Sequence, residues 1–384
     1  MNADLITQII TRVFPSGSEL FWQADTIEQN NRFWIIPGRE GPRWIIPHDS
    51  IYGWPVLKQW RPYDLSSRLK WTALMAAYRS GQLRLVPGVV GVGVAWNKNW
   101  DHLGWIDEKS PVPVIYIGTP GPARKAVAHL VDASTRKPVA VAKVPLGARA
   151  AENILHEADI LQLLKQEKPG VAPAIKSVNR AIGVSLQNFI GGQTSSRTLT
   201  QSHIDWLAGL SMPGTEVSLR GRAESLGKLL SRSEGLGDKR RYWLERILER
   251  LDDPTPLPAF WVHGDFAPWN LRRVDEGKLV AVDWEEARQA GLPGTDLIYF
   301  CLIQDFLFCR NTPDKTWRRI REFLQSSLAR SYMEKIRLVK KIETSIVLFI
   351  LVEMLIRRSL AVTMTSDLFC KFLINLIQEE LGNP

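Results

Sequence analysis

The sequence predicts an α+β fold in which a small β-rich part precedes a larger helical part. The first observation is a set of three short β-rich runs that Gly, Pro and Ser separate: 112–117, 126–131 and 139–144. The second is a strongly helical segment at 149–164, whose apolar residues recur every three or four positions. The third is the helical periodicity of most segments that follow a further strand predicted at 182–189.

The composition is that of an ordinary globular protein. The chain has 384 residues, of which 45% are apolar and 23% charged, so we expect neither disorder nor a collagen-like structure. A net charge of +9 suits an anionic ligand such as a nucleotide, although many basic proteins carry such an excess on a solvated surface. The three cysteines include no C-x-x-C pair, so we expect reduced thiols and no structural zinc site.

Two features of the chain predict a cytoplasmic protein with no membrane span. The first residues lack the basic segment and apolar stretch of a signal peptide. The most apolar run, at 344–356, is interrupted by Glu353 and is shorter than the ~20 residues that a membrane span needs. We therefore expect this run to form a buried helix.

Residues 1–105 are predicted to form an appended N-terminal module. Nine of the fifteen tryptophans lie there, and the run at 32–37 is nearly repeated at 43–47 after a turn-forming segment at 38–41. The two runs predict a β-hairpin, and a helix is predicted at 65–80. Clustered aromatic side chains fill a core or form a surface for a protein partner, and we favour the core.

The rest of the chain divides into two predicted parts at a pair of glycines. Residues 106–192 hold the β-rich runs and end at Gly191-Gly192, where we expect a hinge. Residues 193–384 are mostly helical and contain one β insert at 260–283. The helices predicted before this insert are 202–210, 218–230 and 238–251.

The β insert carries the side chains that point to a chemical function. A strand ends at His263, and the Gly and Pro that follow force a loop that contains Asp265 and Asn270. Two further strands, joined by a turn, lead to Asp283. Such a hairpin would bring one amide and two carboxylates together. An amide and a carboxylate are hard oxygen ligands suited to Mg²⁺, and the other carboxylate would orient a hydroxyl and accept its proton.

The residues of the insert follow one another in a distinctive order: His263-Gly264-Asp265, Asn270 and Asp283-Trp284-Glu285. In this order they resemble the aminoglycoside phosphotransferase and choline kinase family. The resemblance implies a bilobal protein-kinase-like fold, here with residues 1–105 appended, and transfer of the γ-phosphoryl group of ATP with Mg²⁺. It implies that Asp265 is the catalytic base and that Asn270 and Asp283 bind Mg²⁺. Asp296 would brace the catalytic loop.

A lysine and a glutamate in the β-rich part test this resemblance independently. Lys143 lies in an otherwise apolar strand, where a free ammonium would be costly without a partner. Glu157 comes fourteen residues later, in the predicted helix, and is a candidate for that partner. In a kinase-like fold the lysine would hold the α- and β-phosphates of the nucleotide, and the glutamate would hold the lysine. Taken alone, a lysine in a strand is more often a snorkelling edge residue.

The segment between the first two β-rich runs is a candidate phosphate-binding loop. Gly118, Thr119 and Gly121 would bind phosphate oxygens through the threonine hydroxyl and backbone amides. The segment is not a G-x-G-x-x-G motif, and its two prolines remove two amide donors. The stretch 186–190 lies where the family has the hinge whose backbone binds adenine.

The acceptor is expected to be a small hydroxyl compound, such as a sugar or an amino alcohol. Only twelve residues separate Asp283 from Asp296, too few for the segment with which a protein kinase docks a peptide. Residues 305–358 carry twelve Lys or Arg against six Asp or Glu, which favours a neutral or anionic acceptor unless these charges face solvent. No zinc finger, RNP-like strand or dense basic stripe indicates nucleic-acid binding.

A function of a different class stays open. A catalytically silent kinase-like module would bind nucleotide or a protein partner, with the Trp-rich region as the interface. The irregular loop after Gly118 favours this alternative. The joint presence of five residues opposes it: Lys143, Glu157, Asp265, Asn270 and Asp283. GTP in place of ATP is a further alternative.

Overall fold

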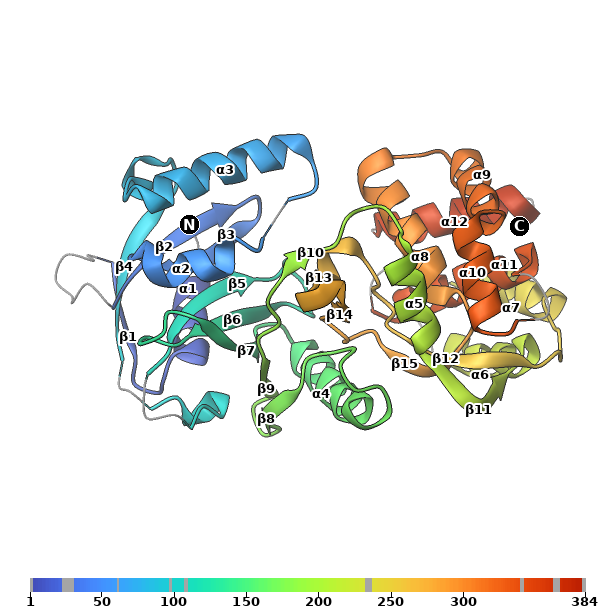
Figure 1. Cartoon of the computed structure of the whole chain (residues 1–384), viewed down its shortest axis with the longest axis horizontal. Coiled ribbons are helices and arrows are strands. Elements are labelled where there is room, and N and C mark those ends of the chain that lie inside the picture. The colour runs from blue at the N-terminus through green and yellow to red at the C-terminus, as the bar shows by residue number, and fades with distance from the viewer. Residues whose placement is uncertain are drawn as a thin grey trace. The chain divides into compact units, whose positions relative to one another are not determined.

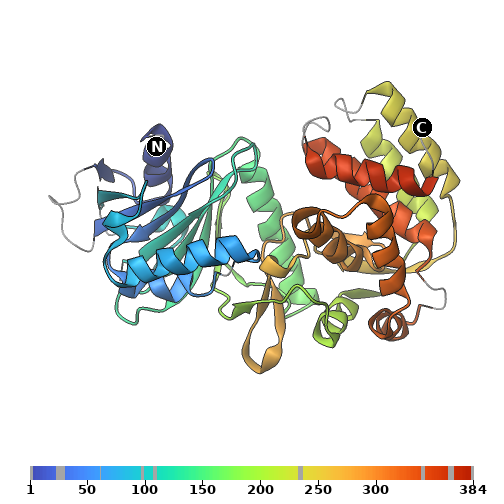
Figure 2. The ribbon, with the colours of Figure 1, turned by 90° about the horizontal axis from the view of Figure 1, so that it is seen from above.

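The computed structural model describes residues 3–22, 31–60, 62–96, 99–106, 110–231, 237–338, 342–361 and 367–381. The chain divides into two compact units (Figures 1 and 2). The first unit comprises Met1–Thr194 and Arg272–Glu285, and the second comprises Ser195–Leu271 and Glu286–Pro384. The predicted α+β class, with a β-rich N-terminal part and a helical C-terminal part, is confirmed.

The first unit is built on one antiparallel sheet. Within the described residues its nine strands follow the order β1-β4-β2-β3-β5-β6-β7-β9-β8. Their bounds are β1 Glu19–Phe21, β2 Arg32–Gly38, β3 Gly41–Pro47, β4 Val90–Ala95, β5 Val112–Ile117, β6 Lys125–Val131, β7 Pro138–Pro145, β8 Ile175–Asn179 and β9 Val184–Asn188. The predicted hairpin is β2–β3, and the three predicted β-rich runs are β5, β6 and β7.

The pairing of β3 with β5 joins the Trp-rich region to the rest of this sheet. Trp44 lies opposite Tyr116, and Ile45 lies opposite Ile115. Strands on both sides of residue 105 therefore belong to one sheet and one unit. The appended module predicted at 1–105 is not confirmed as a separate unit.

Helices cover both faces of the β1–β6 region of the sheet. Because neighbouring side chains on a strand point to opposite faces, Ile35 and Ile36 enter two different cores. The first core includes apolar residues of α1 (Ala3–Val13), and the second includes those of α2 (Ser50–Leu57) and α3 (Leu65–Arg79). Figures 1 and 2 show α3 lying beside β2 and β3.

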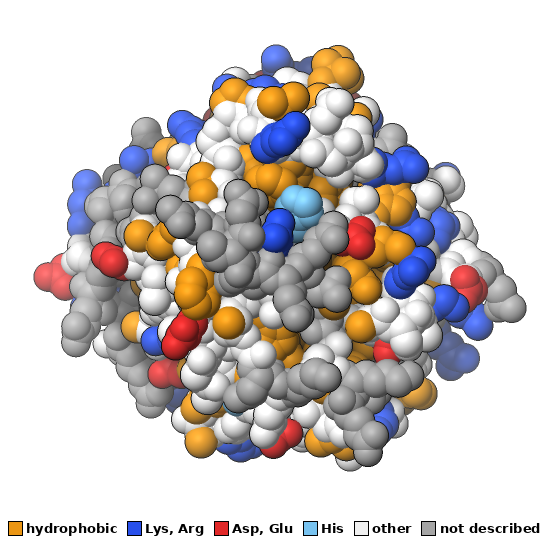
Figure 3. All heavy atoms as spheres, turned by 90° about the vertical axis from the view of Figure 1, so that its left-hand side faces the viewer, with side chains coloured by type: hydrophobic (Ala, Val, Ile, Leu, Met, Phe, Trp, Pro, Cys, Tyr) orange, Lys and Arg blue, Asp and Glu red, His pale blue; other side chains and the backbone are white. Residues whose placement is uncertain are grey.

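Most of the tryptophans near the N-terminus belong to these two cores. Trp100 is 1% exposed in the first core and Trp44 is 3% exposed in the second, whereas Trp22 is 45% exposed. Figure 3 shows hydrophobic side chains in small groups on the end face of this unit, among polar and basic residues. The favoured interpretation, that the aromatic cluster is mainly a packed core, agrees with this burial.

Helix α4 (Ala150–Glu167) packs against β7, β8 and β9 of the same sheet. It includes the predicted helical segment, and its buried face contains Ile154, Ala158, Leu161 and Leu164. Glu157 lies on this same buried face. The helix therefore brings a carboxylate to the sheet beside β7.

The second unit consists mainly of helices. Their bounds are α5 Gln201–Gly209, α6 Leu219–Leu230, α7 Asp238–Arg250, α8 Thr295–Gln304, α9 Pro313–Leu324, α10 Ser327–Lys335, α11 Thr344–Ala361 and α12 Leu368–Leu381. The predicted helices at 202–210, 218–230 and 238–251 are α5, α6 and α7. The predicted buried helix is α11, and no helix in the described ranges has the length and apolar character that crossing a membrane requires.

The β insert contributes strands to two three-stranded sheets. One has the order β11-β12-β15 and belongs to the second unit, and the other has the order β10-β13-β14. Their bounds are β10 Gln193–Thr194, β11 Ser211–Val217, β12 Leu257–Val262, β13 Leu271–Arg273, β14 Leu279–Ala281 and β15 Arg288–Gly291. β12 leads into the segment that contains Asp265, whereas β14 ends just before Asp283.

Candidate functional site

Lys143 is the centre of a buried charge cluster in the first unit. It lies on β7, between β6 and β9, and is 5% exposed. Its Nζ is 2.6 Å from Oε2 of Glu157 and 2.7 Å from Oδ1 of Asp283. Sequence reasoning paired Lys143 with Glu157, and the structure brings both together with Asp283.

Glu157 is held by more than its lysine. The backbone N–H of Trp284 donates to Oε1 at 3.0 Å, and Nε2 of Gln187 donates to Oε2 at 3.4 Å. Glu157 is 1% exposed, so these donors replace the water that its carboxylate loses on burial. The ion pair therefore has one defined geometry, and it ties α4 to the segment after β14.

Asp283 has an unusual backbone conformation. Its φ of 69° lies in the left-handed region, which a residue with a Cβ rarely occupies. Its side chain accepts hydrogen bonds from two ammonium groups on the sheet, those of Lys143 and Lys125, at 2.7 Å each. Such strained positions concentrate at functional sites, where the surrounding contacts hold them.

Lys125 is a site residue that sequence reasoning missed. It is the first residue of β6, and its Nζ lies 2.6 Å from Oε2 of Glu285 as well as 2.7 Å from Oδ1 of Asp283. A lysine at the start of a strand carries no sequence signal that separates it from a solvated surface residue. The alternation of β6 places Lys125 on the same face as Val127, but only the structure shows that Val127 pairs with Lys143.

Burial and neighbouring charges act in opposite directions on the pKa values of Asp283 and Lys125. Burial alone would raise the pKa of Asp283, but the ammonium groups of Lys125 and Lys143 outweigh it and lower that pKa. Burial alone would lower the pKa of Lys125, but the carboxylates of Asp283 and Glu285 raise it. Burial and the neighbouring Asp283 carboxylate raise the pKa of Glu285. Lys125 is thus the cation that Asp283 and Glu285 share.

The candidate phosphate-binding residues lie on an exposed loop between β5 and β6. Gly118 donates its N–H to the carbonyl of Lys125 at 2.9 Å, which closes the base of the loop. Thr119 and Gly121 are exposed. The loop packs on Gly147, where a Cβ would lie only 2.3 Å from the carbonyl oxygen of Pro122. Phosphate binding by Gly118, Thr119 and Gly121 stays a prediction.

The second unit contains the other predicted residues, on the segment that follows β12. Nδ2 of Asn270 donates to Oδ2 of Asp265 at 2.8 Å and to the carbonyl of Asp265 at 3.0 Å. Tyr299, on α8, donates its hydroxyl to Oδ1 of Asp265 at 2.6 Å. Both oxygens of the Asp265 carboxylate therefore have a donor, which defines the plane of this carboxylate. Sequence reasoning missed Tyr299, which comes three residues after Asp296.

Asp296 braces this segment through two backbone amides. Its carboxylate accepts the N–H of His263 at 2.7 Å and the N–H of Gly264 at 2.9 Å. Burial raises the pKa of Asp296 to about 6, although both amide hydrogen bonds act to lower it. Gly264 has a φ of 82°, and a Cβ there would lie 2.3 Å from the carbonyl oxygen of Glu286. Glycine is required at this position by both its φ and its close neighbour.

The predicted metal ligands belong to different units. Asp283 lies in the first unit, and Asn270 and Asp265 lie in the second. Convergence of these three residues around one magnesium ion stays a prediction. Within the described residues no group of three or more His, Cys, Asp or Glu is arranged as a metal site, but Mg²⁺ bound with a nucleotide needs only one or two carboxylates.

The donor chemistry of Asp283 fits a magnesium ion. Both lysines bind Oδ1, and no hydrogen bond within the described part of the chain uses Oδ2. The side chain is 30% exposed, unlike that of Glu157 at 1%. A hard carboxylate oxygen thus remains for a cation.

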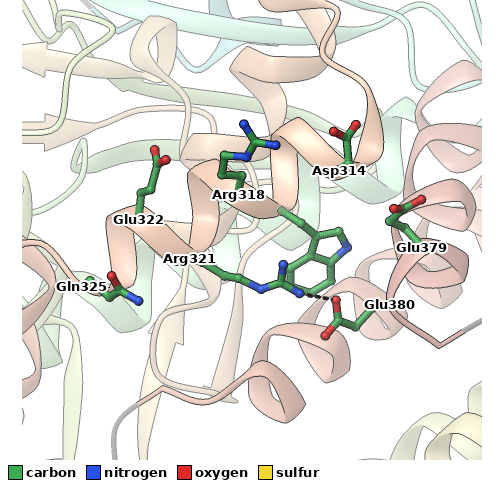
Figure 4. Close-up of a pocket in the computed structure, with 8 residues that line it drawn as sticks. Asp314, Arg318, Arg321, Glu322, Gln325, Glu379 and Glu380 are labelled. Carbon is green, nitrogen blue, oxygen red and sulfur yellow. Dashed lines mark hydrogen bonds and ion pairs between the residues drawn. The ribbon is translucent and has the colours of Figure 1, made fainter.

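Two cavities lie away from these residues, one in each unit. In the first unit, a cavity of about 390 Å³ is lined by Trp54, Trp60 and Trp71 together with Gln193 and Thr194. In the second unit, a cavity of about 330 Å³ lies between α9 and α12. Figure 4 shows its charged lining, including the ion pair of Arg321 with Glu380.

Several solved structures align with the chain. An ADP-bound aminoglycoside phosphotransferase is 15% identical and covers 69% of this chain and 92% of its own, with a TM-score of 0.42. The choline kinase LicA from Streptococcus pneumoniae is 14% identical and covers 73% of this chain and 85% of its own, with a TM-score of 0.40. A Plasmodium vivax ethanolamine kinase is 12% identical and covers 70% of this chain and 81% of its own, with a TM-score of 0.44.

The family is shown by the sequence. No curated protein matches the chain. A sequence model of the phosphotransferase enzyme family matches residues 126–325, which is 200 of the 384 residues. This range includes Lys143, Glu157, Asp265, Asn270 and Asp283. The chain therefore belongs to the phosphotransferase enzyme family.

Proposed function

We propose that the protein is a small-molecule kinase that transfers the γ-phosphoryl group of ATP to a hydroxyl group in a reaction that requires Mg²⁺. The single observation that carries this proposal is the bonding of Lys143 to both Glu157 and Asp283. A buried lysine that joins a helix carboxylate to a carboxylate on the metal-binding segment is the arrangement that phosphoryl transfer uses to position a nucleotide. Family membership supports the same reaction class.

Each residue has a proposed role. Lys143 holds the α- and β-phosphates, and Glu157 keeps its ammonium in place. Asp283 and Asn270 hold Mg²⁺, which neutralises charge on the β- and γ-phosphates when bound. Asp265 orients the acceptor hydroxyl and takes its proton. The hydrogen bonds from Asn270 and Tyr299 to Asp265 support this role, because a base acts only when its oxygen is held in position.

The acceptor is proposed to be a sugar or an amino alcohol. The basic excess on the C-terminal helices is weaker support for a neutral or anionic acceptor than the sequence suggests, because five of the twelve basic side chains pair with carboxylates of the second unit. These pairs are Arg319–Asp305, Arg321–Glu380, Lys335–Asp205, Arg357–Glu353 and Arg358–Asp367. Small size and a hydroxyl group are therefore the properties that the proposal requires of the acceptor.

A second candidate is a kinase-like module that binds nucleotide without turnover. Two observations favour it. The loop with Gly118 and Thr119 has two prolines in place of amide donors, and Lys125 already bonds one oxygen of the carboxylate proposed to bind Mg²⁺.

Replacement of the proposed base distinguishes the two candidates. ATP consumption by the purified full chain is measured with Mg²⁺ against a panel of sugars and amino alcohols. Asp265→Asn is expected to lower turnover of the active acceptor by about a thousandfold, within the range of general base catalysis. The affinity for ADP, measured by calorimetry, is expected to stay within about twofold, because Asp265 acts on the acceptor.

Asp275→Asn is the matched control, since Asp275 is an exposed aspartate in the turn between β13 and β14. It should leave both turnover and ADP affinity unchanged. Full activity of Asp265→Asn would contradict the base assignment. Tight binding of Mg·ADP with no turnover of any acceptor would instead favour the silent module.

A further inference from the structure

The first unit places a second lysine beside the proposed nucleotide-binding lysine. Val127 of β6 lies opposite Lys143 of β7, and Lys125 is two residues from Val127 on the same face. Lys125 and Lys143 are therefore diagonal neighbours on one face of the sheet, within reach of a common partner. That partner is Oδ1 of Asp283, which lies 2.7 Å from each Nζ.

The charges of this cluster are nearly balanced without a metal ion. Two ammonium groups, Lys125 and Lys143, face three carboxylates, those of Glu157, Asp283 and Glu285. Lys143 has a buried carboxylate of its own in Glu157. Lys125 instead bridges Asp283 and Glu285, and its side chain is 12% exposed. A divalent cation that binds Asp283 would lie beside the ammonium of Lys125 on the same carboxylate, and the two positive charges would repel each other.

Lys125 also lies next to the proposed phosphate loop. It begins β6 directly after that loop, and its carbonyl accepts the N–H of Gly118 at 2.9 Å. Its four-carbon side chain can rotate while the ammonium stays paired with the carboxylate of Glu285. An ammonium released from Asp283 would therefore remain near the nucleotide phosphates, on the strand that leads away from the loop.

We propose that Lys125 is a tethered cation: its ammonium neutralises Asp283 when no metal is bound, and it moves to the nucleotide phosphates when a divalent cation binds the same carboxylate. This inference rests on the proposed function, because it assigns Asp283 to the metal and the cluster to the nucleotide. Lys125 thus competes with the metal and assists the nucleotide, and its removal changes the two affinities in opposite directions. A lysine that only stabilised the fold would change both in the same direction.

Direct binding measurements on the full chain test this inference. The variant Lys125→Met/Glu285→Gln keeps the net charge of the unmodified protein, so a change in overall charge does not contribute. Its affinity for Mn²⁺ alone, measured by electron paramagnetic resonance, is expected to rise about tenfold, because the ammonium of Lys125 no longer competes for Asp283. Its affinity for ADP without divalent cations is expected to fall about tenfold, since one charge-assisted hydrogen bond to phosphate is lost.

Two single variants complete the comparison. Glu285→Gln retains Lys125 and is expected to bind ADP at least as tightly as the unmodified protein. Asp283→Asn is expected to lose most of the Mn²⁺ affinity, which would identify Asp283 as the carboxylate that binds Mn²⁺. If the double variant does not fold, as judged by circular dichroism, Lys125→Gln replaces it with the same expected directions.

The outcomes separate this inference from the proposed function. If the unmodified protein binds Mn²⁺ and ADP but the double variant matches it, or loses both affinities together, the role of Lys125 is wrong and the proposed function stands. If the unmodified protein binds neither Mn²⁺ nor ADP, both are wrong. Only a gain for Mn²⁺ with a loss for ADP supports the tethered cation.

Discussion

The hydroxyl of Tyr299 donates a hydrogen bond to Oδ1 of Asp265 at 2.6 Å, and Asn270 donates to the other oxygen at 2.8 Å. The carboxylate of the proposed base is thus held from both sides. Tyr299 itself is largely buried, and burial together with the neighbouring Asp265 carboxylate raises its pKa well above the usual value for tyrosine. Its phenol therefore stays protonated and remains a donor.

Tyr299→Phe is expected to lower kcat by about 10- to 100-fold, because a hydrogen bond to a charged group contributes roughly 1.5–3 kcal/mol. KM for ATP should change little, since Tyr299 contacts the proposed base rather than the nucleotide cluster. Steady-state kinetics with the active acceptor measure both constants. Tyr242→Phe is the control, because Tyr242 is 65% exposed on α7. A normal kcat in Tyr299→Phe would show that the hydrogen bond does not position the base.

The sequence predicted those parts of the fold whose local pattern agrees with their tertiary role. The strands β5, β6 and β7 follow from alternation within one residue at each end, and the helix α4 follows from helical periodicity within three. Helix α2 has no such signal, because Gly53 and Pro55 lie inside it and both disfavour a helix. Its burial against the sheet, through Val56 and Leu57, compensates for that poor propensity.

The candidate site shows the same division between local and long-range information. Lys143 was recognised because a charged residue in an apolar strand needs a partner, and Glu157 lies in the next helix. Lys125 could not be recognised in this way, since its partners lie 158 and 160 residues away along the chain. The left-handed backbone of Asp283 likewise follows from contacts that no short stretch of sequence contains.

Glu157→Gln is expected to destabilise the first unit by about 3–5 kcal/mol, the usual cost of removing one partner of a buried ion pair. The neutral amide leaves Lys143 with Asp283 as its remaining anion, and it places an N–H group where the backbone of Trp284 or the ammonium needs an acceptor. Urea unfolding followed by circular dichroism measures the loss. Glu152→Gln, an exposed change on the same helix, should cost less than about 1 kcal/mol. Equal losses in the two variants would contradict a structural role for the buried pair.

Asp296 is expected to make the stability of the second unit depend on pH above pH 4. Its pKa rises from 3.8 to about 6 on folding, so the folded state keeps a proton that the unfolded chain releases. This stabilising contribution is complete below about pH 3.8 and is lost as the pH rises through about 6, a change of roughly 3 kcal/mol. Urea unfolding at pH 4 and pH 7 should show this change in the unmodified protein and not in Asp296→Asn. The same pH dependence in both proteins would exclude Asp296 as its source.

Glu353 is the buried acceptor of a cluster of three arginines in the second unit. It lies on α11, is 1% exposed, and forms ion pairs with Arg222, Arg288 and Arg357. Burial alone would raise the pKa of Glu353, but the three guanidinium groups outweigh it and lower that pKa to about 2. The sign of its effect on stability is therefore opposite to that of Asp296.

Glu353→Gln is expected to destabilise the second unit by about 3–5 kcal/mol at pH 7, because three partly buried arginine side chains lose the buried carboxylate that they share in the described part of this unit. In the unmodified protein this contribution is present above pH 4.5, the ordinary value for glutamate, and is lost as the pH falls towards 2. The difference in urea midpoint between the two proteins should therefore be smaller at pH 3 than at pH 6. Glu334→Gln, an exposed change on α10, controls for general effects of charge. A difference that grows on acidification would contradict the lowered pKa and the role of Glu353 as the anion of this cluster.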